Sequence, residues 1–105
     1  FELSPEGNAL VVSVVTRGVS DDANGQPIEG DAVHLRVSKF GSAIAFHYSL
    51  DGERWTLHRI FCLREPSAPI SAGFLAQCPT GEACRADFSC ISFVEKKLCD
   101  PRDGS

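Results

Sequence analysis

The chain has 105 residues, of which 43% are apolar and 23% are charged. This is the length of one modest domain and the composition of an ordinary globular protein, which excludes a disordered tail. The formal net charge of −4 lacks the basic footprint of a nucleic-acid or anionic-membrane binder. No apolar run approaches the roughly 20 residues that span a bilayer. We therefore predict neither a nucleic-acid partner nor a membrane partner.

Alternation with a period of two runs through most of the chain, and no stretch carries a helical stripe. Six segments rich in Val, Ile, Phe and Ser are predicted as β-strands: residues 10–17, 33–40, 43–50, 55–63, 70–77 and 85–94. Gly, Pro, Asn and Asp predict turns or loops at residues 21–30, 40–43, 66–69 and 79–81. This spacing predicts an all-β, antiparallel, jelly-roll-like sandwich or a barrel.

The first central hairpin has a register that the sequence specifies. A two-residue loop at residues 41–42 places Val37 opposite Phe46, and this pair is predicted to face the core. Arg36 then lies opposite His47 on the other face of the sheet.

The second hairpin turns through an Asp-Gly step, a strong hairpin signal. A four-residue loop at residues 51–54 puts Trp55 and Leu57 in the core and His58 opposite His47 on the other face. A three-residue loop would turn both apolar side chains out of the core, which costs about 1.5–3 kcal/mol for each. We therefore predict the four-residue loop.

This register predicts a cross-strand row of polar side chains on the face away from the core. Their hydrogen-bond donors suit the hydroxyl groups of a saccharide or the surface of a protein partner. The candidate ligand-binding residues are Arg17, His34, Arg36, His47 and His58.

The three histidines also match a metal site in residue type, with His47 facing His58 and His34 as a third arm. The guanidinium of Arg36 beside them repels a cation, so we predict no metal. We predict no cofactor either.

The sequence lacks the residue patterns that are typical of a catalytic site. Glycosidases need a pair of carboxylates across a cleft, and no predicted strand carries acids in the spacing E-x-D-x-x-E. No G-x-S-x-G nucleophile elbow occurs. The prediction is a chain without catalytic residues of its own.

The five cysteines are odd in number and form no C-x-x-C pair, which argues against a zinc ribbon or a thioredoxin-like site. The favoured interpretation is reduced thiols that pack as small apolar residues in a cytoplasmic protein. The alternative is one or two disulfides near the C-terminus of a secreted protein. The residues are Cys62, Cys78, Cys84, Cys90 and Cys99.

Several motifs occur in an order that resembles a known family. They read VVTRGVSD at residues 14–21, LRV at 35–37, FHYSLDGERW at 46–55, GFLAQCPTGE at 73–82 and FSCISF at 88–93. In this order they resemble the uncharacterised concanavalin A-like jelly-roll family that includes the regulation-of-enolase protein. The resemblance implies a β-sandwich over residues 1–98, incomplete at its N-terminus. Because the residues that follow are polar, we predict a frayed tail at 99–105.

Half of a jelly roll leaves open sheet edges. The resemblance therefore implies either an N-terminal half outside this chain or a second copy in a homodimer. Our working hypothesis is a non-catalytic domain that binds a saccharide or a protein partner. The alternatives are a carbohydrate-active enzyme with its acids in the missing half, and a regulatory interaction protein of carbohydrate metabolism.

Overall fold

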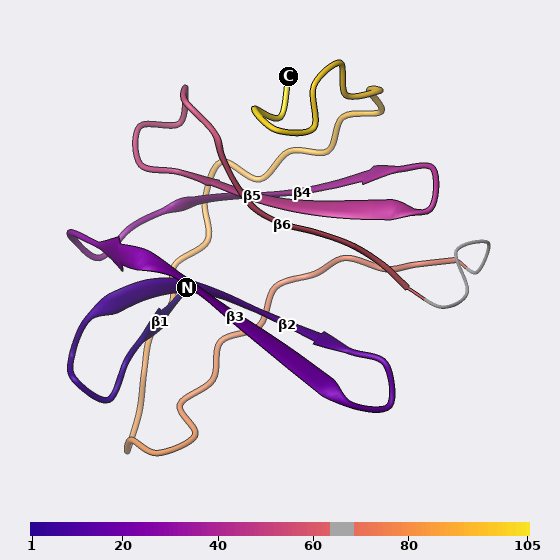
Figure 1. Ribbon diagram of the computed structural model, residues 1–105. Helices are drawn as coiled ribbons and strands as arrows, with labels where there is room; N and C mark the ends of the chain where they lie inside the picture. The colour runs from indigo at the N-terminus through magenta and orange to yellow at the C-terminus, as the bar shows by residue number, and fades with distance from the viewer. Residues whose placement is uncertain (64–68) are drawn as a thin grey trace.

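The computed structural model describes residues 1–63 and 69–105, and it confirms the all-β class (Figure 1). The described residues form two three-stranded antiparallel sheets, ordered β1-β2-β3 and β4-β5-β6, and no helix. None of these residues therefore forms a helix long and apolar enough to cross a membrane. The strands are β1 Glu2–Leu3, β2 Ala9–Thr16, β3 Ser20–Ile28, β4 His34–Phe40, β5 Ala43–Ser49 and β6 Thr56–Cys62.

The structure of the first sheet shows that the loop predicted at residues 21–30 is wrong. Residues 21–30, expected to be a loop, mostly belong to strand β3, which pairs with β2 in a ladder that includes Val15 opposite Asp21. The β2 backbone supplies hydrogen-bonding partners that outweigh the turn preference of the polar residues. Because β3 is an edge strand, its polar side chains reach solvent, and Pro27 is tolerated there.

The first hairpin of the second sheet confirms its predicted register. Val37 pairs with Phe46 and Arg36 pairs with His47. The ladder between β4 and β5 is regular along its whole length. A local turn signal was therefore sufficient to fix this pairing.

The predicted register of the second hairpin is confirmed only for the residue pairs far from its turn. Phe46 pairs with Arg59 as the four-residue loop requires, but His47 pairs with Leu57. The extra residue, His58, is a β-bulge that shifts the register by one between these two pairs. The prediction that His58 lies opposite His47 is therefore wrong.

The bulge also changes which side chains share a face. Leu57, as the partner of His47, lies on the face that carries Arg36, and the Trp55 ring lies against Arg36. The predicted core positions of Trp55 and Leu57 are therefore wrong. Our burial argument failed because it took this face to be open to solvent, whereas residues 101–104 cover it.

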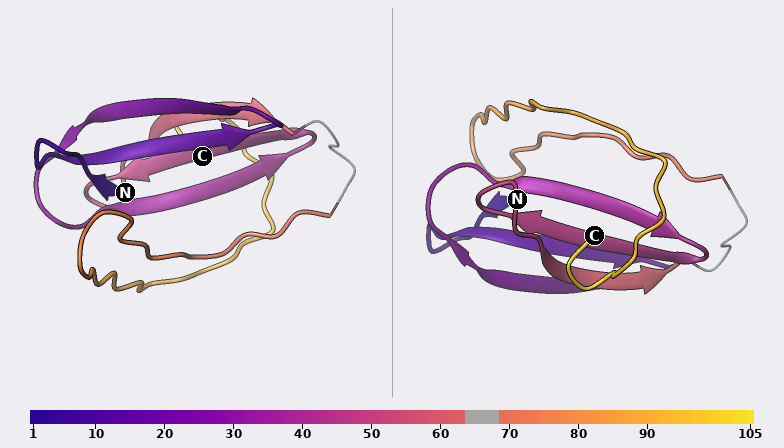
Figure 2. Two further views of the ribbon diagram at one scale, coloured as in Figure 1. Left: turned by 90° about the horizontal axis from the view of Figure 1, so that it is seen from below. Right: turned by 90° about the horizontal axis from the view of Figure 1, so that it is seen from above.

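The two sheets stack as layers (Figure 2). Between them, Arg59 of β6 donates to the backbone oxygen and carboxylate of Asp21 at 3.0 and 2.7 Å. The Phe46 and Phe61 rings meet edge to face at 4.9 Å. The buried apolar core is small and consists of Val11, Val15, Ile28, Ile44 and Ala45.

Residues 69–98 run outside both sheets as irregular chain (Figures 1 and 2). The predicted strands at residues 70–77 and 85–94 are therefore absent from the structure. Alternating residues alone do not make a strand, because a strand also needs a neighbouring backbone to pair with. The expected loop at residues 66–69 falls almost wholly outside the described residues.

The cysteines form no disulfide in the structure. The expectation that they pack as small apolar residues is wrong, because four of the five are exposed and Cys78 is only half-buried. Their side chains lie in β6 and in the irregular chain, where little covers them.

Candidate functional site

Arg36 and His47 form the centre of the candidate site. They are cross-strand partners on β4 and β5, so their side chains project from the same face of the sheet. Arg36 Nη1 donates to the backbone oxygen of Gly104 at 2.9 Å. His47 Nε2 lies 2.7 Å from the backbone oxygen of Pro101, and since a carbonyl only accepts, this nitrogen carries the proton.

His47 is deeply buried, with 2% of its surface exposed. Its second ring nitrogen, Nδ1, is also buried and has no hydrogen-bond partner within the described ranges. Buried polar atoms nearly always have a partner. His47 Nδ1 is therefore an exception to this rule.

Trp55 completes what we call the Arg36–His47–Trp55 face. The guanidinium carbon of Arg36 lies 3.7 Å from the centroid of the Trp55 ring, a cation–π contact. This stacking holds the guanidinium in place while leaving nitrogens at its edge free to donate. Sequence reasoning missed Trp55 here because the predicted register placed its ring on the other side.

Residues 99–105 form a compact turn instead of the expected frayed tail, and we call it the C-terminal turn. The Gly104 amide donates to the Asp100 oxygen at 3.0 Å, and the Cys99 amide donates to the Ser105 oxygen at 2.6 Å. The Ser105 amide also donates to the Asp103 carboxylate at 2.9 Å and lowers the pKa of Asp103. The Asp-Pro and Asp-Gly steps are a turn signal, but nothing in the sequence indicated where the turn would dock.

The other three predicted site residues do not join this centre. His34 projects from the same face but lies at its exposed end, beside Gly52. His58 is turned by the bulge toward the first sheet, where its Nε2 lies 3.1 Å from the hydroxyl of Ser13. Arg17 donates to the backbone oxygen of Cys62 at 3.1 Å. The structure therefore brings together two of the five candidates.

The Asp51 carboxylate organises the Asp-Gly turn between β5 and β6. It accepts hydrogen bonds from the amides of Arg54 and Glu53 at 2.8 and 2.9 Å, and from the Ser49 hydroxyl at 2.9 Å. These hydrogen bonds, with that of the Arg54 amide the strongest, lower the pKa of Asp51 from 3.8 to about 2. The ionised form is therefore the one that closes the turn.

This lowered pKa predicts an acid-dependent loss of stability. A carboxylate whose pKa falls on folding stabilises the protein above its unfolded-state pKa, and this is lost as the pH drops through the folded-state value. We expect the Tm of the wild type to fall more steeply between pH 3.8 and about 2 than that of Asp51→Asn, whose amide does not titrate. Thermal melts of both proteins over a pH series measure this. Parallel Tm curves in this range would contradict it.

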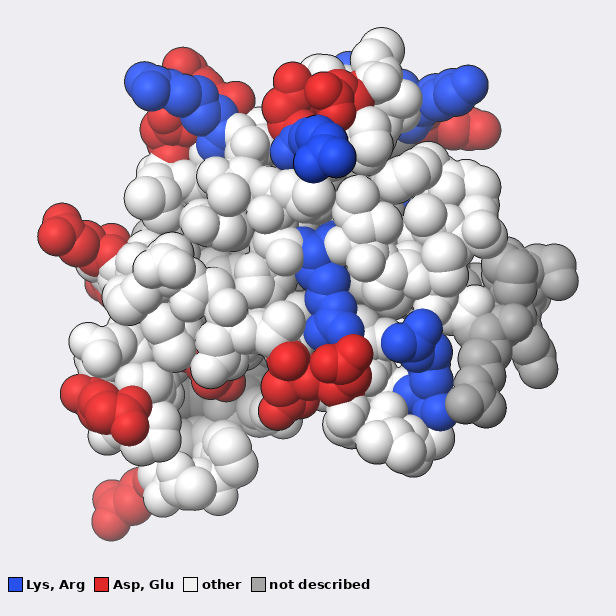
Figure 3. All heavy atoms as spheres, viewed as in Figure 1, with Lys and Arg blue, Asp and Glu red and all other residues white. Residues whose placement is uncertain are grey.

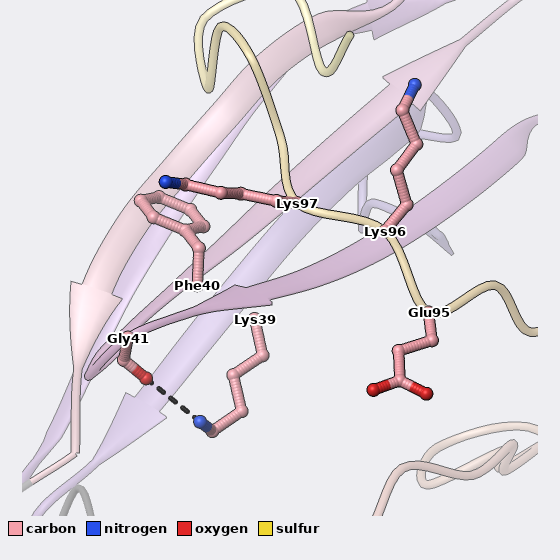
Figure 4. A pocket seen from close by; sticks show the side chains of 6 residues that line it. All are labelled: Lys39, Phe40, Gly41, Glu95, Lys96 and Lys97. Carbon is pink, nitrogen blue, oxygen red and sulfur yellow. Dashed lines mark hydrogen bonds between the residues drawn. The ribbon is translucent and has the colours of Figure 1, made fainter.

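Two shallow hollows lie elsewhere on the surface. The larger, of about 340 Å³, is lined by Lys39, Phe40, Gly41, Glu95, Lys96 and Lys97. Its lysines do not converge: Lys39 donates to the Gly41 oxygen at 2.9 Å, and Lys96 points away from the rest (Figure 4). The smaller hollow, of about 230 Å³, adjoins the Asp-Gly turn and is lined by Tyr48, Leu50, Asp51, Arg54 and Thr56.

Comparison with known proteins gives a family and no named relative. No curated protein and no solved structure shows significant similarity to the chain. One family model, described as "Protein of unknown function (DUF1349)", matches residues 1–96 and ends before the C-terminal turn. Since this match covers most of its length, the chain belongs to the DUF1349 family.

Proposed function

We propose that this chain is a non-catalytic binding module that recognises a second polypeptide through residues 69–94. The observation that carries the proposal is a set of large apolar side chains that are exposed to solvent, on a segment that pairs with no strand among the described residues. Phe74, Leu75 and Phe93 are 63%, 79% and 94% exposed. Ile70, Phe88, Ile91 and Val94 are also exposed.

Two physical properties of this segment favour a polypeptide as the partner. Contiguous exposed apolar surface marks interaction sites, and burial of each such side chain contributes about 1.5–3 kcal/mol. Backbone outside a ladder also offers its amides and carbonyls to an added strand, which is β-augmentation. Residues 69–94 lie mostly behind the sheets in the view of Figure 1, and the near face, drawn in Figure 3, carries Lys, Arg, Asp and Glu side chains at its centre as well as at its rim.

The same proposal accounts for the alternation in residues 70–77 and 85–94. Strands from a partner would give these segments the ladder that they lack and would cover their apolar side chains. The assembly would then be a jelly-roll-like sandwich, as the family resemblance implies. Such strands can come from a second copy of this chain or from a different protein. If that protein is an enzyme, binding through residues 69–94 would give this chain a regulatory role.

Self-association and hydrogen exchange test the proposal. In a monomer we expect the amides of residues 69–94 to exchange rapidly and the apolar segment to bind the dye ANS. When a partner or second copy binds, both signals should fall. The double variant Phe74→Ser/Leu75→Ser should weaken association, while Val14→Ser, an exposed apolar residue on β2, is the matched control. A monomer in which residues 69–94 are protected from exchange would overturn the proposal.

A second candidate function has one observation in its favour. The hollow beside the Asp-Gly turn combines the Tyr48 ring with the ionised Asp51 carboxylate, the Arg54 guanidinium and the Thr56 hydroxyl. An aromatic ring that stacks on a sugar and polar groups that bind its hydroxyls are what a saccharide site needs. A glycan array tests this candidate, and binding that survives Tyr48→Ala would exclude this hollow as the site.

A further inference from the structure

We infer that the Arg36–His47–Trp55 face is a recognition site for a tight polypeptide turn, and that the C-terminal turn occupies it as an intramolecular ligand. A partner polypeptide with a turn of the same chemistry would compete for the face. This surface is separate from residues 69–94, so the inference does not depend on the proposed function.

The face is arranged by groups that do not belong to the turn. Arg36 is held by the Trp55 ring at 3.7 Å, and its pairing with His47 is set by the β4–β5 ladder. Both side chains aim a donor at a backbone carbonyl of a segment more than 50 residues away in sequence. Donors that are positioned before binding lose little freedom when a ligand arrives, which favours specific recognition.

The turn is closed mainly by its own hydrogen bonds. Its internal bonds include the Arg102 amide to the Asp100 carboxylate at 2.8 Å and the Gly104 amide to the Asp100 oxygen at 3.0 Å. Side chains of the face reach it by hydrogen bonds to two carbonyl oxygens, those of Pro101 and Gly104. A segment with this organisation can leave the face and re-form elsewhere without breaking the sheet.

Gly104 defines what the face accepts. Its φ of +74° is a conformation that other residues rarely adopt, and a Cβ at this position would lie 3.0 Å from Arg36 Nη1. The residue is itself buried against Arg36 and His47. The face therefore selects a turn with glycine at this position.

Charge describes the rest of the ligand. The turn carries the carboxylates of Asp100 and Asp103 and the guanidinium of Arg102, and this acidic balance suits a face on which the half-buried Arg36 lies beside a histidine. The ligand class is thus an acidic Asp-Pro-x-Asp-Gly turn.

The test uses the full chain with Gly104→Val, which should expel the C-terminal turn. Trp55 is the single tryptophan, so its emission reports on the face. We expect the emission to change in this variant and to return toward the wild type when a synthetic peptide with the sequence of residues 98–105, carrying Cys99→Ser, is added. The wild type should bind the peptide at least about tenfold more weakly, because its own turn fills the site.

Matched controls separate recognition from a general effect of the peptide. The peptide that itself carries Gly104→Val should not bind, and the chain that carries both Arg36→Gln and Gly104→Val should bind neither peptide. If Trp55 emission and the amide NMR spectrum of the folded Gly104→Val chain do not respond to the peptide, the inference is wrong.

A second measurement applies if Gly104→Val prevents folding. Excess unlabelled peptide added to the isotope-labelled wild type should displace the C-terminal turn and move the Gly104 amide signal. A Gly104 signal that stays fixed at saturating peptide would overturn the inference.

Discussion

Replacement of His47 by alanine is expected to lower the free energy of unfolding by about 2–4 kcal/mol. The side chain is 2% exposed and occupies the centre of the second sheet. Its removal leaves a cavity and also leaves the Pro101 oxygen, now 2.7 Å from Nε2, without its donor. Urea denaturation measures the loss. In the folded variant, amide NMR should also show increased mobility of residues 99–105.

His34→Ala is the matched control for this experiment. His34 lies on the same face and two residues before Arg36, but it is exposed and its side chain makes no hydrogen bond to another described residue. We expect a change within about 0.5 kcal/mol. Equal effects of the two histidine substitutions would show that His47 does not anchor the C-terminal turn.

Replacement of Arg59 by alanine is expected to cost about 2–3 kcal/mol, because charge-assisted hydrogen bonds between the two sheets are lost. Arg59 is the β6 side chain that reaches Asp21 of β3 with both terminal nitrogens, and 14% of its side chain is exposed. The sheets share a small apolar core, so this contact is a large part of what joins them. Urea denaturation followed by Trp55 fluorescence, which reports on the second sheet, and by circular dichroism, which reports on both, measures it.

Arg54→Ala supplies the control because it also removes an arginine that faces an aspartate. Its side chain is 93% exposed and lies 3.5 Å from Asp51, and exposed ion pairs contribute little. We expect a change within about 0.5 kcal/mol. A cost for Arg59→Ala as small as that for Arg54→Ala would mean that the Arg59–Asp21 contact does not hold the two sheets together.

The two surfaces proposed for binding differ in physical character. Residues 69–94 present apolar side chains and unpaired backbone, which suit an added strand. The Arg36–His47–Trp55 face presents fixed donors, which suit carbonyl oxygens. Because the surfaces share no residue, a Phe74→Ser/Leu75→Ser chain should still bind its C-terminal turn, and a Gly104→Val chain should still associate through residues 69–94.

The sequence by itself determined features that depend on neighbouring residues. The alternating pattern predicted β2, β4, β5 and β6 to within one or two residues at each end. The short loop at residues 41–42 set the β4–β5 register and with it the Arg36–His47 pair. Such features follow from turn geometry and from side chains that alternate along a strand.

Tertiary structure decided which faces are covered and where strands find partners. The bulge at His58 separated it from His47, and the C-terminal turn buried a histidine that the sequence placed in solvent. Polar residues of β3 became a strand because β2 lay beside them, whereas the apolar residues 70–77 and 85–94 had no such neighbour in the part of the chain that the structure describes. Burial and strand pairing are contacts between segments distant in sequence, so local pattern specifies the side chains that can take part but not the surface that they meet.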